Sequence, residues 1–75
     1  MDKGKKLLDI INAIRRNKGD SPINALAPST NLRRELDFDS FDMAELTVKI
    51  EVEFGIDIFE NGVVETYSEI LDKLK

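Results

Sequence analysis

The segment SFDMAELTVKIEVEF, residues 40–54, repeats apolar residues at helical spacing on two opposite faces. At about 100° per residue, one face carries Met43, Leu46, Ile50 and Phe54. The opposite face carries Phe41, Ala44, Val48 and Val52. Asp39 is a favourable N-cap and Gly55 a favourable helix end, so we expect a central helix between them.

Two apolar faces on one helix constrain the fold, because a helix that covers one side of a core needs only one. One interpretation is that flanking helices bury both faces. The other assigns the face with Met43 to the core and leaves the face with Phe41 partly exposed, beside Asp42, Glu45 and Glu51. A chain of 75 residues has little material to cover both faces, which favours the second interpretation.

Further helices are expected on either side of the central one. The segment KKLLDIINAIRR predicts a helix over about residues 4–17, and NKGDSP ends it. Thr66 and Glu69 have the spacing of a capping box, which predicts a last helix over about residues 66–74. LRREL is expected to form a short turn, and the loop INALAPSTN is apolar enough to pack on the core. Because no pair of strands is indicated, we expect one domain, residues 1–75, folded as a small all-α bundle.

The chain contains no Cys and no His. Disulfide frameworks, zinc sites, and Ser/His or Cys/His nucleophilic pairs are therefore excluded, which argues against an enzyme. A calcium loop beginning at Asp37 fails too, since Val48 stands where Glu is needed, and we expect no metal site. No apolar run approaches the roughly 18 residues of a membrane span, and the amino end lacks a signal-peptide pattern. We expect a cytoplasmic protein, and a monomer.

Charge is distributed unevenly along the chain. Residues 1–34 contain eight Lys/Arg and three Asp/Glu, whereas residues 35–60 contain nine Asp/Glu and one Lys. The acidic central part would repel nucleic-acid phosphates and attract basic proteins. The basic KGKK near the amino end has no interleaved aromatic residues, and we interpret it as a solvated helix face. We therefore expect protein partners and no nucleic acid.

Ser40 stands in the first turn of the central helix, within DFDSFDMAEL. Its hydroxyl has three candidate roles, which are helix capping, nucleophilic catalysis, and modification by another enzyme. Asp39 competes for the capping role, and no His is present to act as a catalytic base. The helix terminus would favour an attached phosphate, although the neighbouring carboxylates oppose it.

The stretch LDFDSFDMAELTVKIEVEFGIDI resembles the core motif of acyl carrier proteins, in which Asp-Ser-Leu opens an acidic helix of the form D-S-L-D-x-x-E-L. The matching positions are Asp39, Ser40, Asp42, Glu45, Leu46, Glu51, Glu53 and Phe54. STNLRREL and VETYSEIL resemble the flanking segments of that family, so the resemblance covers most of the chain. It implies a four-helix bundle with three main helices and one short helix, the latter around residues 58–63.

The resemblance also implies a function and a cofactor. Ser40 would carry 4′-phosphopantetheine, transferred from coenzyme A by a separate phosphopantetheinyl transferase, and Asp39 would belong to the recognised motif. The thiol of this group would hold acyl intermediates as thioesters for fatty acid, specialised acyl or polyketide biosynthesis. The protein would present them to other enzymes without being an enzyme itself.

Partner contacts are implied as well. Acyl-loading and acyl-processing enzymes would meet the central helix through basic docking patches. On this chain, the acidic residues that contact these enzymes would be Asp42, Glu45 and Glu51. The apolar residues that contact them would be Phe41, Ala44 and Val48.

Two alternatives stay open at this point. Phe41 replaces the Leu that usually follows the serine, which resembles the Asp-Ser-Phe of D-alanyl carrier proteins. The chain would then be a D-alanyl or other aminoacyl carrier. The second alternative is a helical interaction module that binds partners through the same helix without any prosthetic group.

Overall fold

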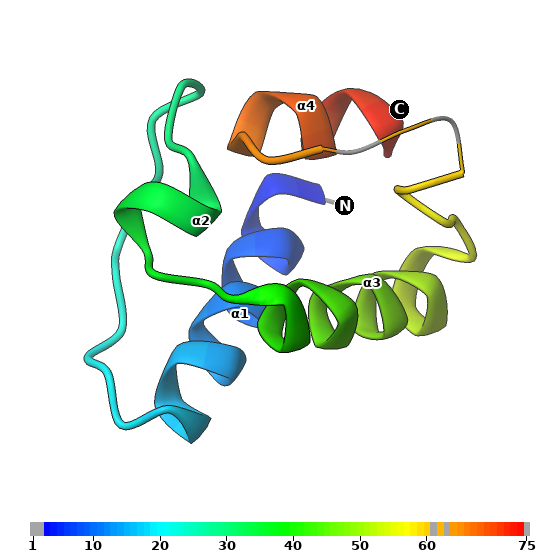
Figure 1. The fold of residues 1–75 in the computed structure, drawn as a ribbon. Helices are drawn as coiled ribbons and strands as arrows, with labels where there is room; N and C mark the ends of the chain where they lie inside the picture. The colour runs from blue at the N-terminus through cyan, green and yellow to red at the C-terminus, as the bar shows by residue number, and fades with distance from the viewer. Residues whose placement is uncertain (1–2, 61, 63, 75) are drawn as a thin grey trace.

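The computed structural model describes residues 3–60, 62 and 64–74, and their regular secondary structure is α-helical (Figure 1). The helices are α1 (Lys3–Asn17), α2 (Leu32–Glu35), α3 (Ser40–Phe54) and α4 (Tyr67–Lys73). Within these residues the only β-type pairing is an isolated bridge between Asn31 and Thr66. The prediction of a small all-α fold with three main helices and one short helix is confirmed.

α1 and α3 are the two long helices, and they pack directly against each other. One ion pair lies at each end of their contact. Lys6 near the start of α1 reaches Glu53 near the end of α3, and Lys18 just beyond α1 reaches Asp42 in the first turn of α3. The two helices therefore run past each other in opposite senses.

α4 closes the bundle near the amino end of α1 (Figure 1). Its Tyr67 hydroxyl donates to the Gly4 carbonyl oxygen at 3.3 Å, and Lys3 donates to the Leu74 carbonyl. Thr66 and Glu69 form the predicted capping box at the start of α4. No helix of the described part of the chain is both long and apolar enough to cross a membrane.

The core collects apolar side chains from all four helices and from the segments between them. Its buried members are Leu7, Ile11, Ile14, Leu32, Leu36, Phe38, Met43, Leu46, Ile50, Ile58, Val64, Ile70 and Leu74. Ile23 and Leu26, in the long loop between α1 and α2, are partly buried against this core, as the apolar sequence of that loop predicts.

The two faces of α3 have different environments. Met43, Leu46 and Ile50 are buried and Phe54 packs partly buried against the core, whereas Phe41, Ala44, Val48 and Val52 are exposed. The interpretation that only one apolar face belongs to the core is therefore confirmed. We call the four exposed residues Phe41, Ala44, Val48 and Val52 the apolar stripe.

The short helix lies elsewhere than expected. The short helix of the bundle is α2, which Asn31 caps by accepting a hydrogen bond from the Arg34 amide. The expected helix around residues 58–63 is wrong over 58–60, where the chain forms a turn, and positions 61 and 63 lie outside the described residues. In this turn Ile58 is buried and the Asp57 carboxylate accepts from the Phe59 amide, so the link is fixed by an Asx-type turn and one apolar anchor.

Candidate functional site

Ser40 is the first residue of α3 and is exposed to solvent. Asp39 precedes it with extended backbone angles and caps the helix. The Asp39 carboxylate accepts from the Asp42 amide at 2.8 Å, and the Asp42 carboxylate accepts from the Asp39 amide at 3.1 Å. This reciprocal capping box satisfies the helix end without Ser40. Within the described part of the chain the Ser40 hydroxyl has no hydrogen-bond partner, so the capping role considered for it is wrong.

Asp42 does not belong to the acidic rim that the sequence predicts. Its side chain is only 7% exposed and accepts a 2.6 Å hydrogen bond from Lys18 in addition to its capping bond. Burial raises the pKa of Asp42, but the hydrogen bonds from Lys18 and from Asp39 outweigh this and hold that pKa below its ordinary value. The carboxylate is therefore charged and engaged inside the protein. The assignment of Asp42 as a partner contact is corrected to a structural role.

The segment immediately before Ser40 is held in an unusual conformation. Asp37 has a φ of 58°, which is the left-handed region that few residues other than glycine adopt. Phe38 follows it with a buried ring, and its amide donates to the Leu32 carbonyl at 3.1 Å. The chain thus turns sharply, anchors one aromatic ring in the core, and enters α3 with Ser40 on the outside.

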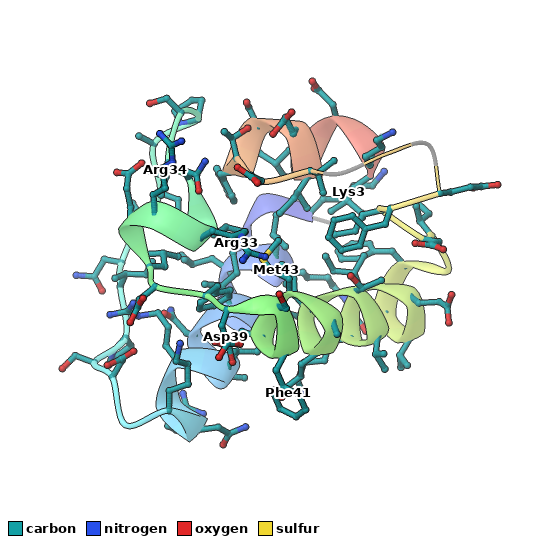
Figure 2. All side chains as sticks on the ribbon, viewed as in Figure 1. Lys3, Arg33, Arg34, Asp39, Phe41 and Met43 are labelled. Atoms are coloured by element: carbon teal, nitrogen blue, oxygen red, sulfur yellow. The ribbon has the colours of Figure 1, made fainter. Side chains whose placement is uncertain are left out.

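The apolar stripe begins beside Ser40 and continues along α3. Phe41 is 77% exposed, Val48 60% and Val52 82%. Figure 2 shows Phe41 projecting from α3 on the side away from α2 and α4. Such a row of exposed apolar side chains on one helix face is typical of a surface that partners cover.

Acidic residues accompany the stripe. Glu51 is exposed, and Glu45 is half-buried and 3.9 Å from Lys49. Both stand on the surface of α3, as predicted for the rim. A charged edge around an apolar strip is the arrangement that steers a partner of opposite charge toward it.

A hollow of about 570 Å³ opens beside Ser40. Its walls come from α2, from α3 and from the link before α4, and they consist of Arg33, Ser40, Met43, Ala44, Thr47, Val48, Asp57, Phe59 and Val64. Most of these side chains are apolar, and the one cation is Arg33. The exposed hydroxyl of Ser40 at the edge of this hollow fits a group that is attached through oxygen and extends over an apolar surface.

A second hollow, of about 530 Å³, lies between α1 and α3. Its apolar walls are Ile10, Ala13, Val48 and Val52, and charged residues of both helices surround them. Val48 lines both hollows, so it forms the ridge between them. Among the residues that the structure describes, no group of three or more Asp and Glu side chains could hold a metal ion.

Two residues near Ser40 were missed by reasoning from the sequence. Lys18 contacts Asp42, 24 positions further along the chain, and no local pattern signals such a pair. The sequence pattern assigns Arg33 only to a short turn, although the structure places it in the lining of the hollow beside Ser40. A basic residue directly after the apolar Leu32 in this short segment is only a weak signal that Arg33 lies near Ser40.

Comparison with known families gives one match. A family model described as "Phosphopantetheine attachment site" matches residues 6–72, which is most of the chain and includes α2, α3 and the hollow beside Ser40. No curated protein and no solved structure matches the chain.

Proposed function

The chain belongs to the phosphopantetheine attachment site family of carrier domains, and from this premise we propose that it is an acyl carrier protein modified at Ser40. Carrier domains of this family are not catalytic, so the chain is a carrier and not an enzyme. Their prosthetic group is 4′-phosphopantetheine, and a phosphopantetheinyl transferase and client enzymes are its partners in general. The attachment residue, the acyl cargo and the docking residues are our proposals.

The observation that carries the proposal is the state of Ser40. Its hydroxyl is exposed and unpaired among the described residues, while Asp39 occupies the N-cap position and caps the helix together with Asp42. The positive end of the helix dipole at the first turn of α3 favours an anion bound at this point. A hydroxyl so placed is suited to receive a phosphate ester.

When bound, the 4′-phosphopantetheine group supplies the thiol that this chain lacks, since the sequence contains no Cys. The side chains around Ser40 would orient and shelter what is attached there. Met43, Ala44 and Val48 offer an apolar wall along the hollow, and Arg33 offers a positive charge at its edge. We propose that this hollow accommodates part of the attached arm or its acyl chain and limits the access of water to it.

Partner enzymes would dock on the exposed face of α3. Phe41, Ala44 and Val48 would make the apolar contact, and Glu45 and Glu51 would meet basic patches on the transferase and on acyl-loading and acyl-processing enzymes. The stripe starts at the residue after Ser40, so a partner that binds the stripe would lie next to the attachment site. We propose fatty acid, specialised acyl or polyketide biosynthesis as the setting of these enzymes.

The experiment is an intact-mass measurement after incubation with coenzyme A and a broad-specificity phosphopantetheinyl transferase. The wild-type protein and Ser29→Ala, a control at another exposed serine, should both gain one phosphopantetheine group. Ser40→Ala should gain none. Failure of the wild type to react would instead support a helical interaction module that works without a prosthetic group.

A D-alanyl or other aminoacyl carrier is a second candidate, and Phe41 directly after Ser40 favours it, because Asp-Ser-Phe resembles the motif of D-alanyl carrier proteins. The two candidates share the attachment site and differ in cargo. Preferential loading of the modified protein with D-alanine by a D-alanyl carrier ligase, over loading with fatty acids by an acyl carrier synthetase, would select the aminoacyl carrier.

A further inference from the structure

Lys18 makes three contacts with the segment that surrounds Ser40. Its ammonium group donates to the Asp37 carbonyl oxygen at 2.6 Å and to the Asp42 carboxylate at 2.6 Å. The same nitrogen lies 5.4 Å from the centre of the Phe38 ring, which is within the range of a cation–π contact. One side chain thus contacts residues on both sides of Ser40.

Lys18 is itself held in place by the end of α1. Its backbone amide donates to the carbonyl oxygens of Ile14 at 3.2 Å and Arg15 at 3.1 Å. Gly19 then takes a φ of 86° and turns the chain away from the helix. The start of the side chain is therefore fixed relative to α1, so the ammonium group connects α1 to the entrance of α3 without a long flexible loop between them.

The contact with Asp37 is the most informative of the three. A left-handed backbone is unfavourable for most residues with a side chain, and Asp tolerates it better than most, so groups that bind this turn add to its stability. The Lys18 ammonium binds the carbonyl of this residue, and the buried Phe38 ring follows. Without the cation, the turn keeps its aromatic anchor and the bond from the Phe38 amide to Leu32, but the carbonyl oxygen of Asp37 in the same peptide group loses its bond to Lys18.

The contact with Asp42 acts on the capping box. Asp42 uses the same carboxylate oxygen to accept from Lys18 and from the Asp39 amide. Asp37 and Asp39, both exposed, add negative charge around the ammonium group. The hydrogen bond to Asp42 raises the pKa of Lys18 against the opposing effect of burial, so the cation is present throughout the neutral range.

We propose that Lys18 is a positioning residue for the modification of Ser40: by binding Asp37 and Asp42 together, it holds the turn and the capping box in the arrangement that presents the serine hydroxyl to the transferase. This inference rests on the proposed function. In that reaction the Ser40 oxygen bonds to the phosphorus that carries the pantetheine arm, and the phosphoanhydride bond of coenzyme A breaks. Adenosine 3′,5′-bisphosphate leaves, and the serine proton passes to a base of the transferase.

The structure provides a matched control. Lys6 also joins α1 to α3, through a 2.6 Å ion pair with Glu53, but at the far end of the two helices. Lys18→Met and Lys6→Met therefore each remove one lysine and one ion pair of the same length between the same elements. Only the first of them changes the surroundings of Ser40.

The experiment measures the rate of phosphopantetheine transfer at a temperature where circular dichroism shows every variant folded. We expect kcat/KM for Lys18→Met to fall about tenfold, because a small misplacement of a reacting group is costly, while Lys6→Met stays within about twofold of the wild type. Lys18→Arg, which keeps a cation, should recover at least part of the rate. If Lys18→Met does not fold, Lys18→Gln takes its place in the same comparison.

Amide hydrogen exchange gives a readout that does not depend on the transferase. In Lys18→Met, protection should fall several-fold at Phe38, Asp39 and Asp42, whose amides donate within the turn and the capping box, and not in the middle of α3. Equal transfer rates for Lys18→Met, Lys6→Met and the wild type would overturn the proposal, and so would unchanged protection at those three amides. A wild-type protein that is never modified would refute the proposed function instead, so the two failures are distinguishable.

Discussion

Phe41→Ala separates the role of the apolar stripe in docking from any role in folding. Phe41 is 77% exposed, so only about a quarter of its side chain contacts the rest of the protein. A phenylalanine side chain offers about 200 Å² of surface, so the substitution removes about 50 Å² of buried area, or at most about 1 kcal/mol of folding free energy. Alanine is also the better helix former by about 0.5 kcal/mol, which offsets part of this loss.

The expected effect on docking is larger. The exposed part of Phe41 amounts to about 150 Å², and its complete burial by a partner would be worth at most about 4 kcal/mol. Interfaces rarely realise the whole of such an upper limit, so we expect a loss of about 1–2 kcal/mol, or about 5- to 30-fold in affinity.

The assay pairs chemical unfolding with transfer kinetics. Phe41→Ala should unfold within about 1 kcal/mol of the wild type, while KM for the carrier in phosphopantetheine transfer rises about 5- to 30-fold. Val52→Ala is the control, since Val52 is 82% exposed on the same stripe but about 16 Å further along α3. An unchanged KM for Phe41→Ala, with the protein folded, would show that the stripe next to Ser40 does not contact the transferase.

Two further predictions concern charge. Glu51→Lys should leave the free energy of unfolding within about 0.5 kcal/mol, because the residue is exposed, and should slow transfer at low salt more than at high salt; the same slowing at both salt concentrations, or none, would contradict docking by charge. The second concerns pH. Because the pKa of Asp42 is lowered in the folded protein, its stabilising contribution is complete above the unfolded-state pKa of 3.8 and is lost as pH falls through the folded-state pKa. Because the pKa of Lys18 is raised in the folded protein, its stabilising contribution is complete below the unfolded-state pKa of 10.5 and is lost as pH rises through the folded-state pKa. Urea unfolding should therefore show the largest difference between the wild type and Lys18→Met between these limits, and a difference that does not depend on pH would refute this assignment.

Local sequence was sufficient for the three longer helices. Asp39 and Gly55 delimit α3 as predicted, and Thr66 with Glu69 begins α4, because caps depend on residues a few positions apart. Helical periodicity also predicted which face of α3 is buried and which is exposed. The burial of Leu46 and the exposure of Val48 depend on the angular positions of these residues around one helix.

Features that depend on distant residues were not predicted. Asp42 stands where the sequence pattern predicts a surface acid. The structure buries it and pairs it with Lys18, which the fold brings to it from the end of α1. The hollow beside Ser40 likewise needs Phe59 and Val64 to be placed against α3 by the irregular link before α4. Around residues 58–60, the Asx-type turn at Asp57 prevailed over the expected helix.

We propose Ser40 as the residue at which this carrier receives its phosphopantetheine group. The most direct test is the intact mass of the wild type, Ser29→Ala and Ser40→Ala after reaction with coenzyme A and the transferase. We expect one added group on the first two proteins and none on the third. Addition to Ser40→Ala, or no addition to the wild type, would contradict it.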